Sequence, residues 1–223
     1  MSVGGADAFY TDAQRAIQRD QGREALADTV FAAIVADALD EMHTAFIESR
    51  DFFFLATVDG TGMPTTSYKG GSVGVVRVDG PKTMSFPSYD GNGMYKSMGN
   101  VADTGKVGLL FIDLETPNRI RVQGSASVSK DPDLVGRWPG AKMAVTVAVE
   151  QVFLNCARYI HKHVRVSDSP YVPAADGAQP HPAWKRIDMV QPALSVEERA
   201  LTEASGGTID FGGYAERLMK GES

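Results

Sequence analysis

The sequence predicts a mainly β protein, an antiparallel barrel or sandwich with helices added at both ends. Two observations lead to this prediction. Six or seven short apolar segments between residues 52 and 154 are separated by turn signals at hairpin spacing, a pattern typical of antiparallel sheets. Strands and helices do not alternate in this region, which argues against a parallel doubly wound sheet.

The first fifty residues are predicted to be helical. Between residues 28 and 50 the apolar positions recur at steps of three and four, which places them on one helix face. Asp28 or Thr29 would cap the start of this helix. A shorter, more polar helix is expected over residues 11–23, and residues 1–10 are expected to be loose.

Beyond Arg50 the spacing of apolar residues becomes that of strands. The apolar run over 52–58 ends at Asp59-Gly60-Thr61-Gly62, which indicates a strand followed by a tight turn. Residues 119–129 alternate, so that their apolar members share one face. The expected strands cover 52–58, 64–68, 73–78, 83–86, 107–113, 119–129 and 143–154, with a short helix over 92–100.

The end of the chain, after residue 166, is rich in Pro, Ala, Gly and Asp. Ser195 followed three residues later by Glu198 is a capping-box pattern, which predicts a helix over 195–204. The glycine-containing tail after residue 206 shows little core-forming pattern. The sequence thus divides into an N-terminal helical extension (1–50), a barrel domain (51–166) and a C-terminal extension (167–223) that packs on the barrel or on a partner subunit.

Composition narrows the class of protein. Lys and Arg number 22 against 28 Asp and Glu, and a formal charge of −6 argues against a nucleic-acid-binding surface. The sequence lacks an apolar run of about 18 residues, so a transmembrane helix is not expected. The N-terminus has neither the basic region nor the apolar core of a secretory signal. We therefore expect a cytoplasmic protein without a membrane partner.

Five sequence segments carry a family resemblance. They are F-L-A-T-V-D-G-x-G-x-P at 54–64, S-Y-K-G-G at 67–71, G-N…S…N at 91–100, V-G-L-L-F at 107–111 and R-V-Q-G-S-A at 121–126. Together they resemble the pyridoxamine 5′-phosphate oxidase-like FMN-binding split-barrel family, over roughly residues 40–165. The resemblance implies a six-stranded antiparallel split β-barrel and a homodimer with FMN at the subunit interface. It also implies flavin-dependent oxidoreduction of a small-molecule substrate.

The phosphate of a flavin is a dianion, which calls for cations, hydroxyls and free backbone amides. The resemblance places these groups on two segments. One is the strand end with Thr66, Ser67 and Lys69, and the other is the helix start with Asn92 and Lys96. Each has a plainer reading, since a strand-end lysine is often only solvated and Asn is common in turns for its geometry alone.

The flavin ring would lie further along the barrel. The strand that ends at Ser88 would run beside the ring, and Arg121 or Gln123, on the polar face of their strand, would reach the ring, the phosphate or a partner subunit. The segment N-C-x-R-Y-I at 155–160 resembles the end of the last barrel strand in a subgroup of the family. Asn155 and Arg158 are therefore candidates for contacting the ring or an anionic substrate.

The sequence departs from the family pattern in two places. Gly93-Met94 follows Asn92 where many relatives carry basic residues, and the C-terminal Trp- and Arg-rich substrate signature is reduced to Trp184-Lys185-Arg186. Three alternatives stay open. The first is a reductase of the same fold that uses the deazaflavin F420. The second is a non-enzymatic flavin- or haem-binding module, and the third is a dimeric interaction protein.

Two further features do not predict a site. The single cysteine, Cys156, cannot form an internal disulfide and is expected to be a small buried apolar side chain. His161 and His163 would form half a metal site in an extended chain, but the sequence offers no third ligand at a suitable spacing. We predict no metal, and the sequence does not assign a catalytic residue.

Overall fold

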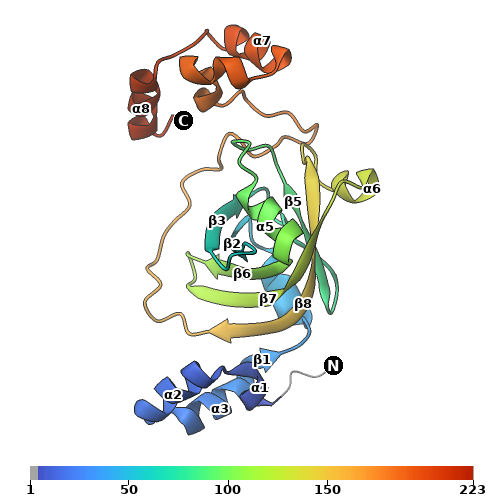
Figure 1. The fold of residues 1–223 in the computed structure, drawn as a ribbon, viewed down its shortest axis with the longest axis vertical. Helices are drawn as coiled ribbons and strands as arrows, with labels where there is room; N and C mark the ends of the chain where they lie inside the picture. Colours follow the sequence, from blue (N-terminus) through green and yellow to red (C-terminus); the bar gives the residue numbers. More distant parts are fainter. Residues whose placement is uncertain (1–4, 223) are drawn as a thin grey trace.

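The computed structural model describes residues 5–222, in which a β-barrel stands between two groups of helices (Figure 1). Seven strands form one antiparallel sheet in the order β3-β2-β6-β7-β8-β5-β4, and β1 pairs with β8. The predicted antiparallel barrel is confirmed, with eight strands instead of six. The strands are β1 (Val35–Ala36), β2 (Phe52–Val58), β3 (Pro64–Gly70), β4 (Arg77–Gly80), β5 (Thr83–Ser88), β6 (Lys106–Asp113), β7 (Asn118–Ser129) and β8 (Met143–Asn155).

The barrel core follows from the alternation of apolar side chains along these strands. In β7, Ile120 and Val122 are fully buried while Arg121 is exposed. Gly124 sits at a bulge between β7 and β8, where a Cβ atom would overlap the carbonyl oxygen of Ala148. The largest fully buried side chains are Phe53, Phe86, Phe111, Ile47, Leu55, Met84, Leu109 and Ile120.

The single helix predicted over 28–50 is wrong. The chain instead forms α3 (Glu24–Ile34), strand β1 and α4 (Glu41–Glu48). Val35 and Ala36 extend because they pair with Phe153 and Val152 of β8. The predicted caps are also wrong, because α3 begins before Asp28; it is Asp40 that caps α4, through a capping box with His43.

The other N-terminal helices are α1 (Ala6–Phe9) and α2 (Asp12–Asp20). Thr11 caps α2 within the predicted range 11–23. Residues 6–9 are helical, which corrects the loose segment expected there, whereas residues 1–4 lie outside the described chain. The group is held by the buried Arg15, which bonds Asp7 and Asp28, and it rests on β8 through an edge contact between Phe9 and Phe153.

Around the barrel, two predicted elements are displaced. The strand expected over 73–78 begins only at Arg77, and the helix expected over 92–100 is α5 (Lys96–Thr104). Its N-cap is Tyr95, in the left-handed region at φ 48°. The predicted connection 131–140 contains a short helix, α6 (Pro132–Val135).

The C-terminal module, defined here as residues 183–220, contains η1 (Ala183–Arg186), η2 (Asp188–Ala193), α7 (Val196–Ala204) and α8 (Phe211–Lys220). The capping box of Ser195 and Glu198 is confirmed at α7. The tail after residue 206, which shows little core-forming pattern in the sequence, forms α8 with Asp210 as its cap, and none of the residues of this helix is buried; Ser223 lies outside the described residues. In the described chain, no helix is long and apolar enough to cross a membrane.

Candidate functional site

Strand β3 carries two polar side chains toward the inner side of the sheet. Ser67 pairs with Leu55 and Lys69 pairs with Phe53 in the neighbouring strand β2. Directly opposed residues of an antiparallel pair point to the same face, and both partners are fully buried. Ser67 and Lys69 therefore stand beside the core at the open edge of the sheet, about 7 Å apart along the strand.

Helix α5 covers this edge. Its second residue, Ser97, is buried, and its hydroxyl lies 3.0 Å from the hydroxyl of Ser67. Asn100, one turn further along the helix, donates to the hydroxyl of Thr57 in β2, which fixes the helix against the sheet. The pair of hydroxyls thus joins two elements that are 30 residues apart in the sequence.

Lys69 is partly buried, and this burial lowers the pKa of its ammonium group. Among residues 5–222, no carboxylate forms an ion pair with it or offsets this effect on its pKa. A lysine in such surroundings gains from a bound anion, because the anion supplies the charge that the protein omits. Two other partly buried cations of the barrel, Arg50 and Arg137, each bond a carboxylate and so differ from Lys69 in this respect.

The start of α5 adds backbone donors. No side chain caps this end, so the first-turn amides lack the partner that capped helices provide. Lys96, the first helical residue, is half-exposed and lies 4.0 Å from Asp59. Ammonium, hydroxyl and helix-end amide groups together form the donor set that suits a phosphate group.

Other predicted residues lie on the opposite, outer face of the same sheet. The strand registers align Thr66, Ala56, Gly108 and Gln123 in one row across β3, β2, β6 and β7. The next row aligns Tyr68, Phe54, Leu110 and Arg121. Within one chain, Thr66, Arg121 and Gln123 are therefore separated from Ser67 and Lys69 by the thickness of the sheet.

The end of β8 is a third location. Asn155 pairs with Arg119, four strands away from β3 in the sheet order, and Arg158 follows in an exposed loop. Cys156 is exposed, so its predicted burial is wrong. The backbone amide of Arg158 donates to the Cys156 sulfur and lowers the pKa of the thiol. This group is not brought next to Lys69 within one chain.

The loop over residues 89–95 connects Ser88, the last residue of β5, to α5. The prediction that Asn92 opens the helix is wrong. Its side chain accepts from the amide of Met94, which makes a turn four residues before the helix begins. Ser88 itself accepts from the amide of Lys142 through its carbonyl group. Asn92 thus shapes the loop and is not at the helix end.

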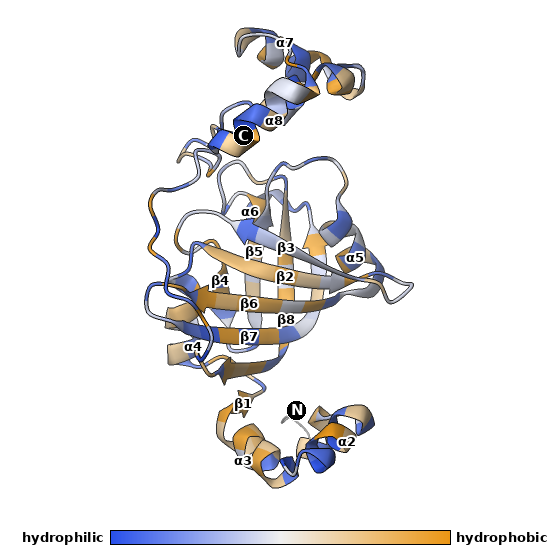
Figure 2. Ribbon diagram, turned by 90° about the vertical axis from the view of Figure 1, so that its left-hand side faces the viewer, coloured by the Kyte–Doolittle hydropathy of each residue, from blue (hydrophilic) through white to orange (hydrophobic). Residues whose placement is uncertain are grey.

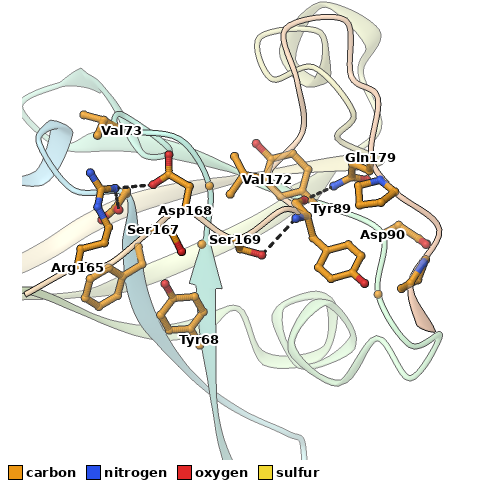
Figure 3. Close-up of a pocket in the computed structure, with 18 of the residues that line it drawn as sticks. Tyr68, Val73, Tyr89, Asp90, Arg165, Ser167, Asp168, Ser169, Val172 and Gln179 are labelled. Carbon is orange, nitrogen blue, oxygen red and sulfur yellow. Dashed lines mark hydrogen bonds and ion pairs between the residues drawn. The ribbon is translucent and has the colours of Figure 1, made fainter. Parts of the chain in front are cut away.

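A large cavity of about 1410 Å³ lies on the outer side of β3, between the barrel and the C-terminal segments (Figure 3). Tyr68 and Tyr89 line it together with Arg165 and Asp168, and Asp90 marks the side that adjoins the loop over 89–95. Phe52 stacks on Tyr68 with ring centroids 5.2 Å apart. The cavity therefore offers aromatic surface beside the strand that carries Ser67 and Lys69.

Sequence reasoning missed two parts of this region. Ser97 stands inside the G-N…S…N segment, and that segment was a signal for it. The contact of Asp90 with Lys185 joins residues 95 positions apart. It leaves no local pattern in the sequence.

The sequence and the fold are similar to those of known proteins. The family described as pyridoxamine 5′-phosphate oxidase matches residues 39–156, slightly more than half of the chain. No curated protein matches the sequence. The barrel is similar to several solved structures of low sequence identity.

Three such structures illustrate the fold. HupZ of Group A Streptococcus is 20% identical with a TM-score of 0.44, covering 56% of this chain and 99% of its own. An FMN-binding protein from Syntrophomonas wolfei is 14% identical with a TM-score of 0.41, over 63% and 97%. HutZ, a heme storage protein from Vibrio cholerae, is 17% identical with a TM-score of 0.39, over 52% and 94%.

Proposed function

The chain belongs to the pyridoxamine 5′-phosphate oxidase family, and from this premise we propose that it is an FMN-binding flavoprotein that acts as an oxidoreductase on a small-molecule substrate. The observation that carries the proposal is Lys69, a partly buried cation without a carboxylate partner in the described chain. It lies two residues along β3 from Ser67, whose hydroxyl contacts that of Ser97 at the uncapped end of α5.

In this proposal, Lys69, Ser67 and Ser97 hold the flavin phosphate, together with amides at the start of α5. Bound FMN supplies hydride and electron transfer, while the protein supplies position and electrostatics. Lys96 contributes a weaker, more exposed positive charge, since Asp59 lies within 4.0 Å of it. The aromatic cavity beyond Tyr68 lies on the outer face of β3, so in this proposal it belongs to the surface that a second copy completes and not to the face that carries Lys69.

We also propose that the active unit is a homodimer. Tyr68 is 61% exposed on the outer face, beside Phe52 and Phe54. A second copy would cover this aromatic face and bring Arg121 and Gln123 to a shared site. Light scattering should then give twice the 23.9 kDa mass of the chain; a monomer mass would contradict the shared site.

The phosphate contact is tested by Lys69→Met. Loss of a charge-assisted bond is expected to weaken FMN binding about 10-fold to 100-fold, measured by quenching of flavin fluorescence. Lys130→Met removes the same charge from an exposed position after β7, and it should leave the dissociation constant unchanged.

The outcome for the wild-type protein separates the proposal from its alternatives. Mass spectrometry of the chromophore that is released on denaturation identifies FMN, F420 or haem directly. An FMN dissociation constant that is equal in Lys69→Met and wild type would remove Lys69 from the cofactor site. A protein that binds FMN but turns over no donor would be a non-enzymatic flavin-binding module.

A further inference from the structure

The C-terminal module contacts the loop over residues 89–95 through a buried lysine, Lys185. Lys185 lies in η1, and its backbone carbonyl accepts from the side-chain amide of Gln191 at 2.7 Å and from the hydroxyl of Thr202 at 3.3 Å. Arg186, next to it, donates to the carbonyl of Gly207. These bonds hold the backbone of Lys185 in place within the module.

The side chain of Lys185 is only 8% exposed and bonds two carboxylates. Its ammonium lies 2.8 Å from Glu198, which belongs to the same module, and 2.5 Å from Asp90, which belongs to the barrel. Burial alone would lower the pKa of Lys185, but the two carboxylates outweigh it and raise the pKa. The lysine is therefore a fixed positive charge between the two parts.

Asp90 occupies the loop over residues 89–95 that leads to α5. In the described chain, the other side-chain hydrogen bonds of this loop stay within it, between Asn92 and Met94. The loop ends at Tyr95, whose left-handed backbone at φ 48° places the first turn of α5 and hence Ser97. The bond from Lys185 holds Asp90 in place, and this restricts the loop over residues 89–95, which determines where α5 begins.

We propose that Lys185 is a positioning residue for the cofactor, because its bond to Asp90 fixes the loop that presents α5 and Ser97 to the phosphate. This role rests on the proposed function. The C-terminal module supplies none of the proposed phosphate donors. In this proposal it acts on the site indirectly, by setting the dissociation rate of the bound cofactor.

Electrostatics makes this role testable, because the two carboxylates can be compared. Asp90→Asn and Glu198→Gln each remove one negative charge near the same lysine. By charge alone, both changes would favour binding of a dianion. Only Asp90→Asn removes the ion pair that joins the module to the loop, so weaker cofactor binding in this variant would indicate positioning and not charge.

The experiment measures FMN affinity and dissociation rate in wild type, Lys185→Met, Asp90→Asn, Glu198→Gln and the double variant Lys185→Met/Asp90→Asn. We expect Asp90→Asn and Lys185→Met to speed FMN dissociation about fivefold to tenfold, while Glu198→Gln stays within about twofold. The double variant should be no worse than the worse single one, because both changes break the same contact.

A second readout does not depend on FMN. Amide hydrogen exchange in the cofactor-free protein should speed up over residues 91–97 in Asp90→Asn, with α7 protected as in wild type. Unchanged dissociation rates and unchanged exchange in Asp90→Asn would overturn the positioning role while FMN binding by wild type stands. Wild-type protein that binds no FMN would overturn the proposed function, and this role with it.

Discussion

The barrel and the C-terminal module are stabilised by different interactions. The barrel buries a continuous apolar core with Phe53, Phe86 and Phe111 at its centre, and its strands are largely hydrophobic (Figure 2). In the described part of the module, the buried residues are Ala183, Lys185, Ile187 and Thr202, two of them polar. The barrel depends on area removed from water, whereas the module depends on a few directional polar contacts.

The difference assigns separate tasks to the two regions. The tightly packed sheet keeps Ser67 and Lys69 at fixed positions. The bond from Asn100 to Thr57 fixes α5 against the same sheet. The contact between Lys185 and Asp90 is polar, so breaking it exposes less apolar surface than opening the barrel core would. The site therefore combines a rigid side on β3 with an adjustable side on the loop over 89–95.

The sharpest test of this contrast is to truncate one phenylalanine in each region. Phe53→Ala should destabilise the barrel by about 3–5 kcal/mol, because it leaves a cavity beside Phe86 and Phe111. Phe211→Ala, in α8, should change stability by no more than about 0.5 kcal/mol, because that ring is 63% exposed. Urea unfolding followed by far-ultraviolet circular dichroism measures both values. Similar losses in the two variants would mean that the module shares the core of the barrel.

The same contrast explains how much could be predicted from the sequence. Strands such as β7 alternate apolar and polar residues at a period of two, and this pattern is local, so most strands and the barrel class could be predicted. The break between α3 and α4 could not, because Val35 and Ala36 extend only to pair with β8, more than a hundred residues later.

The site was predictable in part for the same reason. Ser67 and Lys69 share a short strand segment, and the family resemblance identifies that segment. The contribution of Ser97 depends on where α5 begins. The left-handed backbone conformation of Tyr95 sets this start, and the spacing of apolar residues does not reveal it. The contact between Asp90 and Lys185 depends on how two distant segments dock, and no spacing rule encodes that.

The smallest expected effect is a pH dependence of the stability of the C-terminal module, through His181, which precedes it and contacts it. Its ring nitrogen Nε2 lies 2.9 Å from the hydroxyl of Thr202, a fully buried residue. Burial lowers the pKa of His181, and so do Lys185 and Arg186, while Glu198 acts in the opposite direction. The folded module thus favours the neutral ring.

The sign of the effect follows from this pKa difference. Below the ordinary value of 6.5, the histidine of an unfolded module takes up a proton that the folded module resists, so the module loses stability as the pH falls from 6.5 toward the lowered pKa. Lys185 lowers the pKa of Glu198, so this carboxylate stays charged at pH 5. In a Trp138→Phe background, where Trp184 of η1 is the remaining tryptophan, its fluorescence reports the folding of the module between pH 8 and pH 5. His181→Gln should flatten the profile, and a profile that is identical with and without His181 would exclude this residue as the cause.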